Sequence, residues 1–391
     1  MNICAIICEF NPLHNGHMYL LQQAKQHADF VLCLMSGNFT QRGNLAILEK
    51  SMRARHAIFA GADIVVELPT LYTLSSAEFF AKGAIHLLKS IPNVKKILFG
   101  TENDNLDLLE QVATLYENSN FTSIITQHLK KGNSYIQSKT KTLEQLHLNA
   151  LAQIARTPNN ILAIAYLKAI HTLQADIQAI PILRKGAKYL DRTLYTNYSS
   201  ATAIRHAIFE KNYINVENNL PYYVLDDLKS FATKKAEKQF ENLAIYSILR
   251  DKNFFATIQD CNEGLHNRLY ALATKHVDYI QVIQEATSKR YTSTRIARIF
   301  ANGVLQINKT LLQNSFYHPL YLKVLAVNKD TMQQTLSLLS KANFPSIIQG
   351  TLPKNLTPFA QAIYDKDRLA AYIYKQCTKQ SGQKLQIITR N

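Results

Sequence analysis

The composition of this 391-residue chain, 47% of it apolar, favours a globular protein of two or three domains. No apolar run approaches the ~20 residues that span a membrane, and the N-terminus carries no secretion signal, so we expect a cytoplasmic protein. Five cysteines with no CxxC pair argue against both a disulfide framework and a zinc site.

The net charge of +16 is unevenly distributed along the chain. Residues 1–130 hold 10 Lys and Arg against 11 Asp and Glu, whereas residues 131–391 hold 34 against 17. This asymmetry predicts that the first part carries out chemistry while the later part binds a polyanion. A basic surface that only aids solubility is the alternative.

The first part alternates between strand and helix patterns. Apolar runs predict strands at residues 3–8, 30–35, 63–68 and 96–100, and helical patterns lie at residues 17–24, 49–61 and 77–89. Continuous apolar strands between helices indicate a parallel sheet covered on both faces. Ligands of such sheets bind at the carboxyl ends of the strands, where we expect the loops at residues 9–17, 36–43 and 100–102 to converge.

The loop after the first strand is the main functional candidate. It reads Glu9, Phe10, Asn11, Pro12, Leu13, His14, Asn15, Gly16, His17. A strand, a tight turn and a helix start meet here, so backbone N–H groups and the positive end of a helix dipole favour a phosphate. His14 and His17 share one face of the first helical turn, and Gly16 has no side chain to keep a nucleotide away.

The pattern from residue 106 to 173 is helical, and a further strand follows at residues 175–183. Next comes Ser199-Ser200-Ala201-Thr202-Ala203-Ile204-Arg205, in which serine caps a helix and the arginine lies within about two turns of that cap. We therefore expect the first domain to span residues 1–210.

The remaining chain is predicted to form a helical basic domain at residues 211–310 and a small α+β segment at residues 311–391. Residues 289–298 combine four cations, Lys289, Arg290, Arg295 and Arg298, with an aromatic ring and hydroxyl groups. Such a mixture suits phosphate contacts and base stacking, and a solvated helix face is the alternative.

Charge neutralisation at a phosphate also needs arginine, for which the candidates are Arg42, Arg184, Arg192 and Arg205. Asp63 and Glu67 lie on a predicted buried strand and are interpreted as structural. His27, His56 and His86 lie on predicted helices and are interpreted as surface or core-edge residues. No spacing of His, Cys, Asp and Glu indicates a metal cage, so Mg²⁺ is expected to enter with a nucleotide, held by its phosphates.

The histidine loop resembles the signature of the nucleotidyltransferase superfamily, and the segment 200–205 resembles its second signature. With Met35-Ser36-Gly37-Asn38-Phe39 and Gln41-Arg42-Gly43, the chain resembles the bacterial tRNA(Met) cytidine acetate ligase family. Further matching motifs are Phe99-Gly100-Thr101-Glu102, Pro158-Asn159-Asn160-Ile161-Leu162, Arg184-Lys185-Gly186-Ala187 and Lys289-Arg290-Tyr291-Thr292.

This resemblance implies an α/β protein: a Rossmann-like nucleotidyltransferase domain, a mostly α-helical basic domain that binds tRNA, and a small α+β tail. In that family ATP and acetate form acetyl-adenylate and pyrophosphate, and the acetyl group passes to the wobble cytidine of elongator tRNA(Met). His14 and His17 would steady the triphosphate as the catalytic residues. The implied ATP contacts are Ile7, Cys8, Glu9, Phe10, Asn11, Pro12, Leu13, His14, Asn15, Gly16, His17, Met18, Tyr19, Leu20, Gly100, Asn159 and Arg184.

Two other functions remain open at this point. One is an adenylyltransferase of small-molecule cofactor synthesis, which would not require the extra basic segment. The other is a non-catalytic RNA-binding protein with a degenerate nucleotide fold, against which the intact His14, Gly16 and His17 argue. Oligomeric state and the choice of acid are not readable from the residues.

Overall fold

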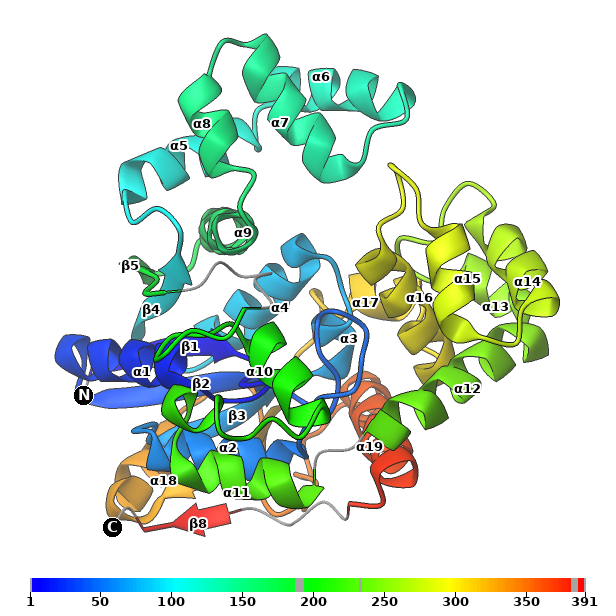
Figure 1. The fold of residues 1–391 in the computed structure, drawn as a ribbon. Helices are drawn as coiled ribbons and strands as arrows, with labels where there is room; N and C mark the ends of the chain where they lie inside the picture. The colour runs from blue at the N-terminus through cyan, green and yellow to red at the C-terminus, as the bar shows by residue number, and fades with distance from the viewer. Residues whose placement is uncertain (1, 187–192, 232–233, 381–385, 390–391) are drawn as a thin grey trace.

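A single sheet organises the computed structural model, which describes residues 2–186, 193–231, 234–380 and 386–389 (Figure 1). Its strand order is β5-β4-β1-β2-β3-β6-β7, with β8 paired to β6. The strands of the first part are β1 (Ile3–Cys8), β2 (Phe30–Ser36), β3 (Ile64–Leu68), β4 (Val94–Thr101) and β5 (Gln178–Leu183), all parallel to their neighbours among these five. The predicted parallel sheet is thereby confirmed.

Helices cover both faces of this sheet because alternate strand residues enter two separate cores. Ile3 and Ala5 join one core, with residues of α4 (Ala77–Lys89) and α9 (Pro158–Thr172). Cys4 and Ile6 join the other, with residues of α1 (Asn15–His27), α2 (Lys50–Phe59), α10 (Ala201–Phe209) and α11 (Tyr222–Phe231). The strand order reverses between β1 and β4, so a ligand crevice is expected beyond their carboxyl ends.

Two helical parts accompany the central sheet (Figure 1). Between β4 and β5 the chain forms α5 (Leu106–Leu115), α6 (Ser119–Lys130), α7 (Tyr135–Gln145), α8 (Asn149–Ile154) and α9. The second part, at the right of Figure 1, contains α12 (Lys234–Arg250), α13 (Lys252–Ala256), α14 (Leu265–Lys275), α15 (Tyr279–Ala286), α16 (Ser293–Leu305) and α17 (Lys309–Asn314). Residues of α12 to α16 form a core of their own.

The C-terminal segment extends the central sheet. Its strand β6 (Leu322–Asn328) pairs antiparallel with β3, and β7 (Ser346–Ile347) and β8 (Gln386–Ile388) pair parallel with β6. Short helices η1 (Glu217–Asn219), η2 (Lys329–Thr331) and α3 (Thr70–Thr73) and the longer α18 (Met332–Ser340) and α19 (Pro358–Thr378) complete the described elements. The boundaries at residues 210 and 310 stay a prediction, and the tail joins the first domain's sheet.

Buried charges fasten this tail to the sheet. Glu67 on β3 accepts from Lys50 Nζ at 2.6 Å and pairs with Lys323 Nζ on β6 at 2.8 Å. Burial alone would raise the pKa of Glu67, but the two lysines lower it to about 2. This gives Glu67 the structural role predicted for it. Among the described residues, no helix combines the length and apolar character that crossing a bilayer requires.

Candidate functional site

The two histidines form the N-terminal cap of α1. His14 is the residue before the helix, and its Nδ1 accepts from the Gly16 amide at 3.1 Å. His17 Nδ1 accepts from the His14 amide at 3.3 Å, which completes a reciprocal capping box. The helix begins at Asn15, two residues earlier than predicted. Because each ring accepts at Nδ1, its neutral form carries hydrogen on Nε2 and is a donor there.

Burial favours the neutral form of both rings. They stack with centroids 3.8 Å apart and 24° between their planes. Burial, followed by the charges of Arg184 and Arg205, lowers the pKa of His14 to about 3. Burial also lowers the pKa of His17 well below its usual value, with further contributions from His14 and Arg184. The histidines therefore offer hydrogen bonds, and the arginines provide the positive charge.

Gly16 has a structural role that the sequence did not indicate. A Cβ at this position would lie 2.9 Å from His14 Cε1 and 3.1 Å from its Nδ1. The glycine therefore makes room for the folded-back His14 ring, and its predicted role in leaving space for a nucleotide stays a prediction.

The loop that precedes the histidines is rigidly held. Phe10 has φ +46°, an uncommon conformation for a residue with a large side chain, and its buried ring meets His17 edge-on at 5.0 Å. The Glu9 carboxylate accepts from the Gln41 amide at 2.7 Å, and Asn11 Oδ1 accepts from the Ile47 amide at 2.7 Å. The loop after β2 thus fixes the loop after β1.

Arg53 of α2 connects these two loops through hydrogen bonds to their backbone carbonyls. Its guanidinium is fully buried and donates to the carbonyls of Glu9 at 2.5 Å and Leu48 at 2.9 Å. It also donates to the carbonyls of Ser36 and Gly37 at the end of β2. Sequence reasoning missed this residue, because Glu9, Ser36 and Gly37 lie 16 to 44 residues from it along the chain.

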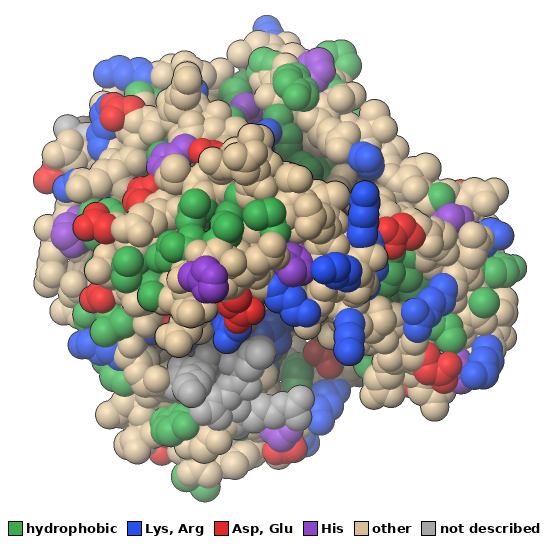
Figure 2. Space-filling model, turned by 90° about the horizontal axis from the view of Figure 1, so that it is seen from above, with side chains coloured by type: hydrophobic (Ala, Val, Ile, Leu, Met, Phe, Trp, Pro, Cys, Tyr) green, Lys and Arg blue, Asp and Glu red, His purple; other side chains and the backbone are tan. Residues whose placement is uncertain are grey.

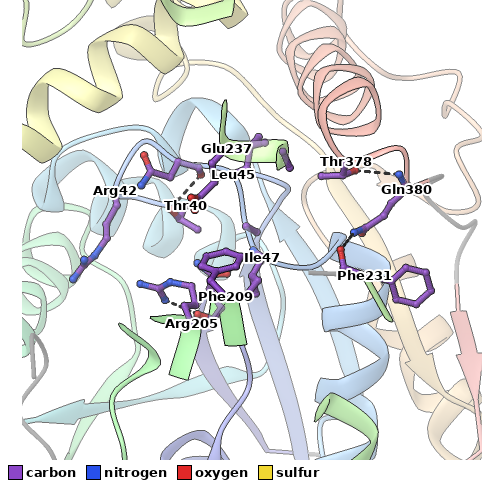
Figure 3. Close-up of a pocket in the computed structure, with 14 residues that line it drawn as sticks. Thr40, Arg42, Leu45, Ile47, Arg205, Phe209, Phe231, Glu237, Thr378 and Gln380 are labelled. Atoms are coloured by element: carbon purple, nitrogen blue, oxygen red, sulfur yellow. Dashed lines mark hydrogen bonds between the residues drawn. The ribbon is translucent and has the colours of Figure 1, made fainter. Parts of the chain in front are cut away.

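Three candidate arginines reach the site. Arg205 donates from Nη1 to the Asn11 carbonyl at 2.6 Å, and Ser200 caps its helix by accepting from the Ala203 amide at 3.0 Å. Arg184 follows β5, with its amide on the Thr101 carbonyl at 3.0 Å. Arg42 and Arg205 line the main cleft and also a small neighbouring pocket, which Figure 3 shows. Arg192 lies outside the described residues.

The end of β4 and the loop after it form a further wall of the site. A Cβ on Gly100 would lie 3.3 Å from Arg184 Cγ, so glycine at this position leaves space for the Arg184 side chain. Asn159 donates from Nδ2 to Glu102 Oε1 at 2.6 Å, and Glu102 Oε2 accepts from the Asn160 amide at 3.0 Å. A carboxylate at the start of α9 suits the helix dipole. Asn159 lines the cleft with its side-chain amide held by Glu102.

These parts enclose a cleft of about 1120 Å³. Most of the predicted ATP residues line it: Ile7, Cys8, Glu9, Phe10, Asn11, His14, Gly16, His17, Tyr19, Leu20, Gly100, Asn159 and Arg184. The remaining predicted ATP residues are not among the described residues that line the cleft; they are Pro12, Leu13, Asn15 and Met18. Leu13 is buried in a core, Asn15 donates to the carbonyls of Asn197 and Asn218, and Met18 Sδ lies 3.9 Å from Tyr223 OH.

The basic stretch borders the same cleft, but its arginines already have partners within the chain. Arg290 donates to the Leu129 carbonyl at 2.6 Å and pairs with Glu263. Arg295 donates from Nε to the Asp260 carbonyl at 2.9 Å and stacks on the Tyr291 ring at 4.6 Å.

Two further cations of this stretch differ in exposure. Arg298 donates to the Gln41 carbonyl at 3.2 Å, and burial lowers its pKa. Lys289 is exposed, and it is absent from the described lining of the cleft. The proposed RNA contacts of Lys289, Arg290, Arg295 and Arg298 stay a prediction. The structure adds that Arg290 and Arg298 also join distant parts of the chain.

The other titratable candidates lie apart from the cleft. Asp63 accepts from the Val31 amide at 2.8 Å, consistent with a structural role. His56 is fully buried and contacts Asp227 Oδ2 at 2.8 Å. Within the described ranges, no three His, Cys, Asp or Glu side chains gather closely enough to hold a metal ion.

A strand, a histidine-capped helix and flanking arginines at a switch point define a nucleotidyltransferase. A family model described as HIGH Nucleotidyl Transferase matches residues 1–387. The chain is 35% identical to the tRNA(Met) cytidine acetate ligase of Thermoanaerobacter sp. (strain X514), over 98% of this chain and 97% of the relative. It is 36% identical to that of Clostridium botulinum (strain Langeland / NCTC 10281 / Type F), over 91% and 90%. The chain belongs to the tRNA(Met) cytidine acetate ligase family.

Solved structures agree with this assignment. The apo form I crystal structure of Thermotoga maritima TmcAL has a TM-score of 0.90 and 25% identity, covering 99% of this chain and 100% of that one. Form II of TmcAL from the same organism, bound with alpha-thio ATP, has a TM-score of 0.88 and 26% identity, covering 97% and 95%.

Proposed function

We propose that this protein is an ATP-dependent ligase that acetylates the wobble cytidine of elongator tRNA(Met). Acetate attacks the α-phosphate of ATP, which forms acetyl-adenylate and releases pyrophosphate. The exocyclic amine of cytidine then attacks the acetyl carbonyl, forms 4-acetylcytidine and releases AMP. The observation that carries the proposal is the histidine capping box, in which His14 is buried and feels the charges of Arg184 and Arg205, in a chain of this family.

The geometry supports a distinct role for each of these groups in the proposed reaction. His14 and His17 donate from Nε2 to oxygens of the triphosphate, in a site whose donors are already oriented before the reaction. Arg184 and Arg205 neutralise charge on the β and γ phosphates as pyrophosphate leaves. Because the chemistry needs positioning and charge neutralisation, it requires no protein nucleophile.

Magnesium is expected to arrive with the nucleotide. Mg²⁺ keeps several waters and is commonly held through substrate phosphates with few protein ligands. The cleft residues fit this arrangement, since their nearest cations and amides can bind the phosphates that carry the ion. We propose the cytoplasm as the place of the reaction.

Pyrophosphate exchange into ATP, with and without acetate, tests the first step. Wild-type protein is expected to show acetate-dependent exchange, and His14→Ala and His17→Ala are each expected to lower it about 100-fold or more, the usual cost of one lost transition-state donor. His27→Ala is the matched control, because His27 lies in the last turn of the same helix. Exchange that needs no acid would favour the small-molecule adenylyltransferase.

Transfer of labelled acetate tests the second step. Label is expected in elongator tRNA(Met) and absent from a transcript whose wobble cytidine is replaced by uridine. Acetate-dependent exchange with no label in RNA would refute the tRNA acceptor. Absence of both activities, together with retained RNA affinity, would favour the non-catalytic RNA-binding protein.

A further inference from the structure

A cluster of charged and aromatic side chains lines the cleft where α4 meets the α5 to α9 part. Glu78, in the first turn of α4, accepts from Lys139 Nζ at 2.6 Å and from the Tyr135 hydroxyl at 3.1 Å. Lys168 Nζ of α9 lies 3.6 Å from the same carboxylate oxygen. All four side chains line the cavity that His14 and His17 line. We call Glu78, Tyr135, Lys139 and Lys168 the Glu78 cluster.

This cluster has an excess of positive charge. Two lysines face one carboxylate, and Lys82 adds a further nearby charge that Lys168 influences. The Lys139 side chain is only 13% exposed, whereas that of Lys168 is 28% exposed and makes the longer contact. Lys168 is therefore the cation best placed to accept an anionic partner from the cleft.

The cluster also holds an aromatic ring in place. Lys139 Nζ lies 4.2 Å from the Tyr116 ring centroid and 4.4 Å from that of Tyr135. Tyr135 remains 41% exposed although its hydroxyl and its ring face are both engaged, and Ile136 beside it is 45% exposed. An exposed ring fixed beside a cation is the arrangement by which proteins bind single-stranded nucleic acid.

The cleft has room for a second ligand. Its volume of about 1120 Å³ exceeds the roughly 300–1,000 Å³ of pockets that hold one small molecule. Arg290 reaches the Leu129 carbonyl at 2.6 Å, so the α5 to α9 part and the basic part meet across it. Figure 2 shows Lys and Arg side chains gathered between the central body and the lobe at its right. A chain with negative charge is the ligand that this surface fits.

We propose that the Glu78 cluster is the subsite for the single-stranded RNA nucleotide that presents its amine to the adenylate. Tyr135 stacks on the base, Lys168 contacts a phosphate, and Glu78 with Lys139 positions the tyrosine ring. This inference rests on the proposed function. It assigns RNA contacts to a helical part outside residues 211–310. Acetate is a poor fit, because a small anion gains nothing from a ring and is repelled by Glu78.

The test separates RNA binding from adenylation. Tyr135→Ala and Tyr135→Leu are expected to raise the KM for tRNA about tenfold, since one stacked base contributes ~1–3 kcal/mol. Acetate-dependent pyrophosphate exchange should stay within about twofold of wild type. Tyr135→Phe keeps the ring and should restore most of the affinity. Leu146→Ala is the control, because Leu146 is an exposed apolar residue at the end of the same helix.

Salt dependence provides a second readout. Lys168→Ala should reduce the slope of log affinity against log salt by about 0.7, the value for one phosphate of a single strand. Lys141→Ala is the matched control, since Lys141 is exposed and bonds Asn133 away from the cluster. An unchanged KM and slope, or an equal loss of exchange and transfer, would overturn the subsite. Failure of wild-type protein to acetylate RNA would instead refute the proposed function.

Discussion

Replacing Gly16 with alanine should remove activity and leave stability almost unchanged. The new Cβ would lie 2.9 Å from His14 Cε1, inside the 3.4–4 Å of ordinary contact. The His14 ring has to move by roughly 0.5 Å or rotate, because the helix backbone at residue 16 is held by α1, and a shift of that size reaches the limit that a functional site tolerates.

The two stability terms oppose one another. Disrupting the cap costs about 1 kcal/mol, while alanine gains about 1 kcal/mol over glycine inside a helix. The net change in unfolding free energy is therefore expected within about 1 kcal/mol. Catalysis has no such compensation, because displacing one preorganised donor costs about 10²–10³ in rate.

Urea unfolding and acetate-dependent pyrophosphate exchange, measured on the same preparation, check this reasoning. Gln22→Ala, at an exposed site on the same helix, serves as the control. Activity of Gly16→Ala within threefold of wild type would show that the His14 orientation is not required. A loss of several kcal/mol in stability would show that the cap matters more to folding than we argue.

Four further predictions follow from geometry already described. Gly43→Ala should cost about 2 kcal/mol or more in urea unfolding, since φ is +85° there and a Cβ would lie 2.5 Å from the Ala297 backbone; a neutral result would mean that the α16 contact adjusts freely. Lys323→Met should cost about 3 kcal/mol by the same measurement, because it leaves buried Glu67 with one cation. His14, with its pKa lowered to about 3, should make stability fall as pH drops below ~6.5, by about 2 kcal/mol at pH 5, because only the unfolded chain takes up the proton. The His14→Gln variant should lose that part of the pH dependence. Lys289→Glu should weaken tRNA binding and reduce the slope of log affinity against log salt by the amount of about one phosphate contact, while pyrophosphate exchange continues. Unchanged tRNA affinity would instead favour a solvated helix face.

The local signals in this sequence predicted local structure well. The apolar runs of β1 to β5 and the turn before α1 are set by neighbouring residues, so their existence and order follow from the pattern. The capping box was within reach as well, since His14 and His17 have the spacing of a cap residue and its third helical residue. Histidine is not the usual residue for either position, so the pattern predicted a shared helix face toward a phosphate and not hydrogen bonds from backbone amides to the two rings.

Long-range partners could not be read from the pattern. The sequence predicted a small α+β segment at residues 311–391, but nothing in that segment identifies β3 as the antiparallel partner of β6. The cations at residues 289–298 predicted a binding surface. Only the fold shows that Arg290 donates a hydrogen bond to the Leu129 carbonyl in the α5 to α9 part. β7 and β8 have two and three residues, too few for any periodicity.

The pairing of β6 with β3 has a consequence for biosynthesis. During translation β3 emerges from the ribosome early. Its partner β6 emerges only after residues 322–328 have been synthesised. Until then β3 presents unpaired backbone groups next to a buried carboxylate, Glu67, that lacks one of its lysines. The catalytic sheet of a nascent chain thus remains unfinished until late in synthesis, which makes chaperone protection of that edge an expected requirement.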